Sequence, residues 1–358
     1  MDVRKMHYLK PIKRRSLLQA AGMALPLGLL VRTGWAATEQ AIPDAGAHQH
    51  ASTGSPAFAL PEPKKLRVTW NANSVCTVSV PAAAERGIFK KYNLDVELIN
   101  FGGSTDQLLE AIATGKADAG VGMTLRWLKP LEQGFDVRIT SGIHGGCMRL
   151  LAPKDSTIRS VADLRGQTIG TSDLAAPDKN FFTILAYQQG VPADSIDWRA
   201  YPADLLSVAL KKGEVKAISL NDPLAWLIKE REGLVEIATN LTSPYQHSVC
   251  CILGIRGSMV RDDRAAARAL TAALRESQEW AAAHPAEAAA IYAAHSGKVK
   301  AEQVETMLRS HTQHHMPSGQ ALEQEIITYA AALRDIGVIR SRTDPERFAK
   351  QITADVLS

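Results

Sequence analysis

The sequence predicts an α/β fold with two lobes, each of them a mostly parallel sheet flanked by helices. Three observations support this fold class. Residues 66–121 follow the order strand, helix, strand, helix, strand, which is typical of a parallel sheet with crossover helices. The same order recurs over residues 167–217. Beyond Arg261, apolar residues repeat at spacings of three and four, which indicates helices.

The elements of the first unit are a strand over 66–70, a helix over 81–92, a strand over 94–99, a helix capped by Ser104 and ended by Gly115, and a strand over 117–121. Pro81 suits the first position of its helix. Gly87 lowers the stability of the same helix, so we expect an irregularity there.

The second unit comprises a strand over 167–171, a helix over 177–189 ended by Gly190, and a strand over 197–201. Its next helix and strand repeat the first unit at one constant offset. Six residues of the first unit match six of the second: Asp106, Leu108, Ala111, Ile112, Gly115 and Ala119 correspond to Asp204, Leu206, Ala209, Leu210, Gly213 and Ala217. Two such units have a natural ligand-binding cleft between them. A buried strand over 249–255 and helices over 261–282, 286–295, 301–311, 320–337 and 344–356 follow.

Residues 1–37 have the pattern of an export signal. Lys13-Arg14-Arg15 precedes an apolar run that ends before Arg32, and Gly34-Trp35-Ala36-Ala37 offers small residues for cleavage. The paired arginines resemble a twin-arginine signal. Residues 38–64 contain much Ala, Pro, Gly, Ser and Thr, and we expect a flexible leader. No cysteine precedes Cys76 as a site for a lipid anchor. The expected location is therefore the periplasm, as a soluble protein.

Composition excludes several functions. The formal net charge is only +4, and no basic block contains interleaved aromatic residues, so we do not expect nucleic acid as a partner. The sequence has no Gly-x-Ser-x-Gly elbow, no phosphate-binding Gly-x4-Gly-Lys-Ser/Thr loop and no His-Glu-x-x-His motif. About 295 residues follow position 63, which is enough for two lobes with their own cores. We therefore expect a binding protein with no cofactor rather than an enzyme.

Four stretches resemble the type II periplasmic binding proteins of the nitrate, sulfonate and taurine importers: Ala84 to Leu98, Leu108 to Gly120, Ser160 to Gly170, and the His284-Pro285 junction. The resemblance extends over nearly all of residues 65–355. It implies a monomer whose two lobes, joined by two crossing strands, deliver a small molecule to an ABC permease in the inner membrane. It assigns residues 65–146 and 255–358 to lobe I, and residues 147–254, with the crossing strands, to lobe II.

The candidate ligand-binding residues are polar or small residues near the ends of the predicted strands, where parallel sheets bind ligands. They are Asn71, Asn73, Cys76, Gly103, Ser104, Thr105, Met123, Thr124, His144, Asp173, Asn221 and Asp222. Several of them are equally suited to capping a helix. Arg126 is the only basic residue close to a strand end, which does not favour a simple oxyanion as the ligand.

The four cysteines form a second group of candidates: Cys76, Cys147, Cys250 and Cys251. With His144, His247, Met123 and Met148, they converge if the crossing strands run side by side. Three interpretations remain open: buried small hydrophobic residues, a disulfide, or a site for a soft metal such as Cu(I) or Zn. Because successive strand residues point to opposite faces, at most one of Cys250 and Cys251 should face the cleft.

Two other functions are compatible with the sequence. The fungal thiamine-pyrimidine synthases resemble the same binding-protein family and carry an iron-associated, cysteine-rich strand, at a place similar to that of Cys250-Cys251. This chain lacks their longer run of cysteines. A ligand-sensing subunit for a membrane receptor would have the same sequence features as a transport protein.

Overall fold

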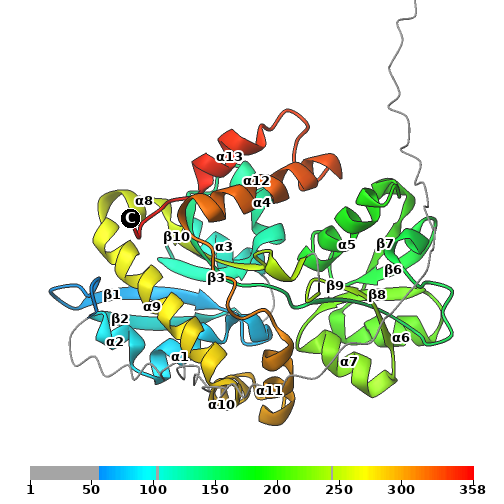
Figure 1. The fold of residues 1–358 in the computed structure, drawn as a ribbon, viewed down its shortest axis with the longest axis horizontal. Coiled ribbons are helices and arrows are strands. Elements are labelled where there is room, and N and C mark those ends of the chain that lie inside the picture. The colour runs from blue at the N-terminus through cyan, green and yellow to red at the C-terminus, as the bar shows by residue number, and fades with distance from the viewer. Residues whose placement is uncertain (1–55, 102–104, 243–244) are drawn as a thin grey trace, which may run out of the picture. The chain divides into compact units, whose positions relative to one another are not determined.

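The computed structural model describes residues 56–101, 105–242 and 245–358 (Figure 1). Its first sheet has five strands in the order β2 (Leu94–Asn100), β1 (Lys64–Trp70), β3 (Ala119–Met123), β10 (Cys251–Arg256) and β4 (Val137–His144). Strands β1, β2 and β3 are parallel, whereas β10 runs antiparallel to both of its neighbours. A strand from late in the chain therefore lies inside a sheet built from early residues.

The second sheet also has five strands, in the order β7 (Asp197–Ala200), β6 (Thr168–Thr171), β8 (Ala217–Asn221), β5 (Met148–Ala152) and β9 (Val235–Thr239). Strands β6, β7 and β8 are parallel, and β5 is antiparallel to β8 and β9. Two mixed sheets of this kind, each flanked by helices, confirm the predicted fold class.

The first sheet is accompanied by η1 (Val75–Thr77), α1 (Ser79–Glu85), α2 (Ile88–Lys91), α3 (Thr105–Ala113) and α4 (Thr124–Glu132). The helix predicted over 81–92 is interrupted between α1 and α2, where Gly87 has a φ of 68°. Only glycine adopts that left-handed conformation at little cost. Pro81 is the third residue of α1, so its predicted place at the start of the helix is wrong.

The second sheet is accompanied by η2 (Val161–Leu164), α5 (Pro177–Gln188), η3 (Ala193–Ser195), η4 (Ala203–Leu205), α6 (Leu206–Lys211), α7 (Leu224–Glu232) and η5 (Tyr245–His247). Pro177 begins α5, where its missing N–H is not needed. Gly233, in the left-handed conformation, ends α7. These elements agree with the predicted repeat of helix and strand up to β8.

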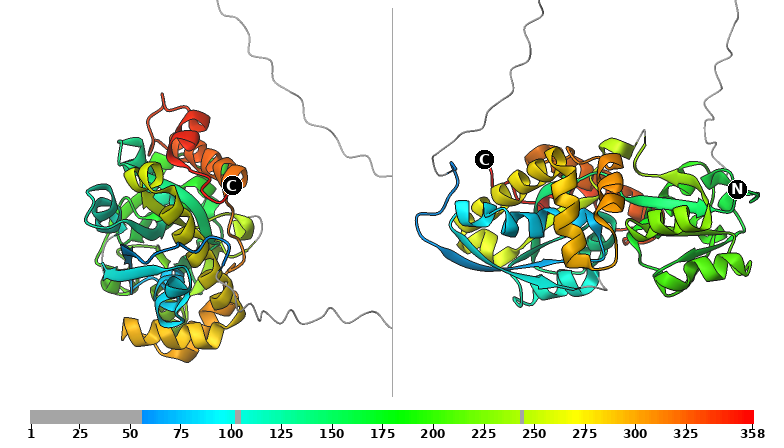
Figure 2. Two further views of the ribbon diagram at one scale, coloured as in Figure 1. Left: turned by 90° about the vertical axis from the view of Figure 1, so that its left-hand side faces the viewer. Right: turned by 90° about the horizontal axis from the view of Figure 1, so that it is seen from below.

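The C-terminal part is helical, as predicted: α8 (Gly257–Asp262), α9 (Arg264–Ala283), α10 (Pro285–Ser296), α11 (Ala301–Ser310), α12 (Gly319–Asp335) and α13 (Pro345–Ile352). Helix α9, drawn in yellow, runs beside α1 and the first sheet (Figures 1 and 2). The backbone N–H of Ala354 donates to the carbonyl of Ile139 in β4. The last helices therefore belong with the first sheet.

Trp127 of α4 forms the centre of the first core. Its side chain is fully buried against Gly122 of β3 and Gly254 of β10. A Cβ atom added at Gly122 would lie 2.1 Å from the indole, and one added at Gly254 would lie 2.6 Å away. Both strands therefore need glycine where they face this ring, because any side chain would displace it.

The chain crosses between the sheets twice. It leaves β4 at His144 and enters β5 at Met148, and it returns between β9 and β10. The side-chain oxygen of Asn240 accepts hydrogen bonds from the N–H groups of Cys147 (2.9 Å) and Met148 (2.8 Å). A Cβ atom on Gly146 would approach the Asn240 carbonyl oxygen to 2.5 Å. The two crossing segments are thus in direct contact.

The predicted export signal, residues 1–37, lies outside the described residues, as does the predicted leader up to residue 55. Residues 56–63 of that leader lie against the first sheet: Leu60 donates its N–H to Tyr92, and Phe58 packs partly buried on the core. Within the described ranges, no helix is both long enough and apolar enough to cross a membrane.

Candidate functional site

A cavity of about 700 Å³ lies where strands of both sheets end. Asn71 directly follows β1 and Met123 ends β3, while Ser172 follows β6 and Asn221 ends β8. All four line the cavity, as expected for the carboxyl ends of parallel strands. The lining also includes Asn73, Arg126, Asp173, Asp204, Asp222, Ser296 and Lys298.

The predicted ligand-binding residues divide into three groups. Six of them line the cavity: Asn71, Asn73, Met123, Asp173, Asn221 and Asp222. Three are buried and not part of its lining: Cys76, Thr124 and His144. Thr124 is used structurally, since its hydroxyl donates to the Cys250 carbonyl over 3.0 Å. Gly103 and Ser104 lie outside the described residues, and Thr105 is the first residue of α3.

An ion pair joins the two sides of the cavity. Arg126 of α4, which is 9% exposed, donates to Asp173 after β6 over 3.1 Å. Asp173 also accepts the backbone N–H of Ala175 at 2.7 Å. The hydrogen bond from Arg126 outweighs desolvation and lowers the pKa of Asp173. The guanidinium charge is therefore matched by a carboxylate at the edge of the cavity.

Lys298 brings a second cation to the cavity, and sequence reasoning missed it. It follows Gly297, which ends α10, and its ammonium group donates to Asn73 Oδ1 over 2.8 Å. Asn71 Oδ1 in turn accepts the backbone N–H of Asn73 at 2.8 Å. The contact between Lys298 and Asn73 spans 225 residues, so no local pattern could have indicated it.

Asp222 is a buried charge in the lining of the cavity. Arg149 of β5 donates to its carboxylate from Nε at 2.9 Å and from Nη2 at 2.8 Å, and His311 donates from Nε2 at 2.8 Å. Burial alone would raise the pKa of Asp222, but these hydrogen bonds outweigh it and lower that pKa. Asp222 also accepts the N–H of Trp226 at the start of α7. The predicted capping role is therefore combined with a buried ion pair.

Asn221 is oriented by a buried acid. Its Nδ2 donates to Asp178 Oδ1 at 3.0 Å, and the Ser219 hydroxyl donates to the other oxygen of Asp178. Burial raises the pKa of Asp178, although the two hydrogen bonds partly offset it. The side-chain oxygen of Asn221 is buried and has no hydrogen-bond partner among the described residues. Asn221 therefore brings an unsatisfied acceptor to the lining of the cavity.

Beside the cavity lies the thiol–imidazole cluster, which we define as Cys76, His144, Cys147, Cys250 and Cys251. All five side chains are buried. The Sγ atoms of Cys147 and Cys250 are 3.7 Å apart. Ligand atoms of Cys76, His144 and Cys251 all lie within 4.8 Å of one another. The predicted convergence of the four cysteines with His144 is therefore confirmed.

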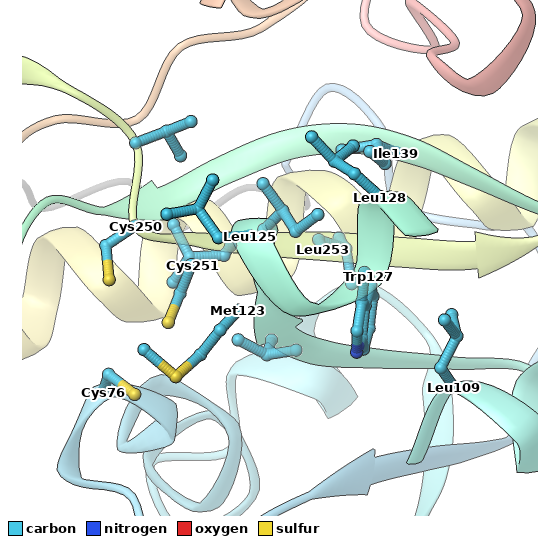
Figure 3. Packing of buried hydrophobic residues seen from close by; sticks show 14 of the residues in the cluster. Cys76, Leu109, Met123, Leu125, Trp127, Leu128, Ile139, Cys250, Cys251 and Leu253 are labelled. Atoms are coloured by element: carbon cyan, nitrogen blue, oxygen red, sulfur yellow. The ribbon is translucent and has the colours of Figure 1, made fainter. Parts of the chain in front are cut away.

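Neither Cys250 nor Cys251 lines the cavity, in agreement with the prediction that at most one of them faces it. The predicted opposite orientation of these two side chains and the predicted participation of His247 were wrong. Figure 3 shows the sulfur atoms of Cys250 and Cys251 directed toward the same side as Met123 and Cys76. Strand β10 begins only at Cys251, so the alternation expected for strand residues does not apply to Cys250. His247 does not join the cluster: it is exposed on η5, and its ring faces His315 at 6.5 Å.

The thiols perturb one another. The thiols of Cys147 and Cys251 lower the pKa of Cys76 and of Cys250, outweighing the opposite effect of burial. The same contacts, together with burial, raise the pKa values of Cys147 and Cys251. Burial would lower the pKa of His144, but Cys76 and Cys250 outweigh it and raise that pKa. Among the four thiols, the pKa is therefore lowered at Cys76 and Cys250 and raised at Cys147 and Cys251.

Two helix-flanked mixed sheets, with a cavity at the carboxyl ends of their strands, are the architecture of the type II periplasmic binding protein fold. Residues 77–288 match the family described as NMT1/THI5 like. This match covers more than half of the chain, and the chain belongs to that family.

Two relatives are each 26% identical to this chain. A candidate binding protein of Brucella abortus aligns over 245 residues, 68% of this chain and 75% of its own length. A candidate thiamine biosynthesis protein of Haemophilus influenzae aligns over 241 residues, 65% of this chain and 73% of its own.

Solved structures share the fold. The alkanesulfonate-binding protein SsuA of Xanthomonas axonopodis pv. citri, bound to MOPS, superposes with a TM-score of 0.69 at 17% identity, covering 83% of this chain and all of its own. The periplasmic nitrate-binding protein NrtA of Synechocystis superposes with a TM-score of 0.66 at 14% identity, covering 83% of this chain and 87% of its own.

Proposed function

We propose that this chain is the periplasmic solute-binding component of an ABC importer and holds one small polar organic molecule in the cavity between its two sheets. The observation that carries the proposal is the cavity itself, with side chains from the ends of β1, β3, β6 and β8 converging on it. The named binding functions of SsuA, NrtA and the Brucella protein support the same class of function. Export by a twin-arginine-like signal, and delivery to a permease, belong to this proposal.

The size of the cavity favours an organic ligand. A volume of about 700 Å³ falls within the range of about 300–1,000 Å³ that small organic ligands occupy in proteins. A bare inorganic oxyanion would leave most of this space to water.

The polar groups of the cavity favour a neutral or zwitterionic ligand. Arg126 is bonded to Asp173, and the carboxylate of Asp222 is bonded to Arg149 and His311. The lining also contains a further cation, Lys298, and a further carboxylate, Asp204. The amides of Asn71 and Asn73, whose oxygens are already bonded, offer N–H donors. The unpartnered oxygen of Asn221 suits an N–H or O–H group of the ligand.

The test is a thermal-shift screen of purified protein against nitrate, alkanesulfonates, taurine, amino acids and pyrimidines, followed by calorimetric titration of any compound that raises the melting temperature. We expect one ligand per chain. In the Asn221→Ala variant we expect about 10-fold weaker binding, because one buried hydrogen bond is lost. The matched control is Gln324→Ala, an exposed amide on α12 that is outside the cavity lining.

Two results would contradict the proposal. Equal affinity in wild type and Asn221→Ala would reject the placement of the ligand. Conversion of the ligand, followed by mass spectrometry, would instead support the second candidate function, a thiamine-pyrimidine precursor synthase. The specific observation that favours this second candidate is the cluster of four buried thiols next to the cavity, together with the thiamine biosynthesis description of the Haemophilus relative.

A further inference from the structure

The register of the first sheet places three possible metal ligands in one row. Cys251 of β10 is paired with Met123 of β3 on one side and with His144 of β4 on the other. Directly paired residues of neighbouring strands extend from the same face of a sheet. Cys76 of η1 reaches this row from outside the sheet, and Figure 3 shows its sulfur near those of Met123 and Cys251. Four separate segments therefore bring soft donor atoms together.

His144 is a buried group whose polar atoms are not satisfied. Its side chain is 1% exposed, yet among the described residues neither ring nitrogen has a partner at hydrogen-bonding geometry, although the Cys76 thiol is close enough to raise its pKa. The ring stacks on His311 at a centroid distance of 6.2 Å and an interplanar angle of 11°, a geometry in which neither ring donates to the other. Buried imidazole nitrogens are normally bonded to a protein group, a water or a metal. A metal ion bound to His144 would supply the partner that its ring nitrogens lack.

We propose that Cys76, His144 and Cys251 bind one thiophilic d10 metal ion, Cu(I) or Zn(II), beside the cavity. Their ligand atoms lie within 4.8 Å of one another, which is compatible with a shared ion at about 2.0–2.3 Å from each. Two thiolates and an imidazole suit these cations, whereas hard cations prefer oxygen ligands. In the described part of the chain, no carboxylate belongs to this group. On binding, each thiol releases its proton to solvent and its sulfur lone pair forms the bond to the metal.

Further donors are available to complete the coordination. A Cu(I) ion is satisfied by three soft ligands, and the Met123 thioether lies close to Cys251 across the sheet. A Zn(II) ion requires a fourth ligand, which Cys147 or Cys250 supplies from the same cluster. Met123 also lines the cavity, so the metal site lies immediately beside the space assigned to the organic ligand. This inference goes beyond the proposed function, and neither depends on the other.

The test titrates reduced, metal-free protein under anaerobic conditions. One sample is titrated with Cu(I) and another with Zn(II), each in competition with a chromophoric chelator for that ion. We expect one metal ion per chain and the release of about two protons per ion, because two thiols are deprotonated. Cys76→Ala, Cys251→Ala and His144→Ala should each weaken binding of the preferred ion about 100-fold or more, since loss of even an indirect contact costs 10–100-fold. The ion that binds more tightly identifies the metal.

The matched control is Thr140→Ala, which truncates a buried side chain of β4 outside the cluster and leaves His144 and all four thiols in place. We expect its affinity to stay within a few-fold of wild type. Should a ligand variant fail to fold by circular dichroism, X-ray absorption of the wild-type complex supplies the answer, with at least two sulfur atoms and one nitrogen bound to the metal. The proposal would be overturned if the wild-type protein did not bind one metal ion per chain. It would also be overturned if the three ligand variants bound the metal as tightly as the wild type. A protein that binds its organic ligand but no metal refutes this inference alone.

Discussion

His311 donates a hydrogen bond from Nε2 to Oδ2 of Asp222 over 2.8 Å, and both side chains are completely buried. Asp222 follows β8 of the second sheet, whereas His311 follows α11, which packs with α10 among the C-terminal helices. Arg149 completes this arrangement from β5. The contact links two parts of the chain 89 residues apart at the side of the cavity.

Replacing Asp222 tests the importance of this link. We expect Asp222→Asn to lower the free energy of unfolding at neutral pH by about 1–3 kcal/mol, because Arg149 and His311 would lose a charged acceptor and Glu236 alone would balance the buried guanidinium. The folded-state pKa of Asp222 is lowered, so its contribution is present above the unfolded pKa of about 3.9 and is lost as the pH falls through the folded value. The difference from wild type should therefore shrink as the pH is lowered below about 4.

Urea unfolding, followed by tryptophan fluorescence at several pH values, measures this difference. Asp155→Asn is the matched control, since Asp155 is an exposed carboxylate of the second lobe. A difference that persists unchanged at low pH would show that Asp222 does not stabilise the fold through its charge.

The ion pair between Arg126 and Asp173 should contribute to ligand affinity. We expect Arg126→Ala and Asp173→Ala each to weaken binding of the ligand found in the screen, because each removes half of a bridge across the cavity. The double variant should bind the ligand no more weakly than the single variant of lower affinity. This corresponds to a coupling energy between the two side chains of about 0.5 kcal/mol or more. Calorimetry of the four proteins measures this cycle, and strictly additive effects would mean that the pair does not act as a unit.

Gly146 should tolerate no side chain. We expect Gly146→Ala to destabilise the protein by about 1–3 kcal/mol or more, because its Cβ would meet the Asn240 backbone at 2.5 Å. Gly166→Ala is the control: Gly166 has a φ of 71° but open space around it, so only the left-handed conformation is penalised, by about 1–2 kcal/mol. Thermal unfolding compares the two variants. A smaller loss of stability in Gly146→Ala than in Gly166→Ala would show that the crossing segments adjust easily to the added Cβ atom.

All four cysteines should be reduced and, in the native protein, shielded from thiol reagents. We expect four thiols per chain to react with a thiol reagent after denaturation in the presence of a chelator and without reductant, and far slower reaction in the native protein, because all four are buried. Two reactive thiols instead of four would indicate a disulfide, for which Cys147 and Cys250 are placed most favourably at 3.7 Å.

The fold could be predicted from local patterns, whereas much of the site could not. Alternating strands and glycine-ended helices predict the two sheets, and the carboxyl ends of their strands place Asn71, Met123 and Asn221 in the lining of the cavity. Lys298 and His311 escaped prediction because their partners lie 225 and 89 residues away, and no spacing rule connects such residues.

The cysteines show the limit of a rule that depends on exact strand boundaries. Alternation would separate Cys250 from Cys251, but the pairing of β10 with β4 is irregular here, with a shift of register between Cys251 and Ile252, and both sulfur atoms point to one side (Figure 3). Convergence could be predicted because it depends on topology alone, whereas the direction of each side chain depends on one residue of register.

The position of β10 between β3 and β4 determines the order in which the two halves can form during synthesis. Strands β5 to β9 are contiguous in the chain, so the second sheet has all its strands once residue 239 has emerged from the ribosome. The first sheet begins at residue 64, but the position between β3 and β4 stays unfilled until residues 251–256 have been synthesised. Helix α9 is synthesised later still. The N-terminal half is thus the last to be completed, and its apolar strand edges remain exposed to chaperones or aggregation for longest.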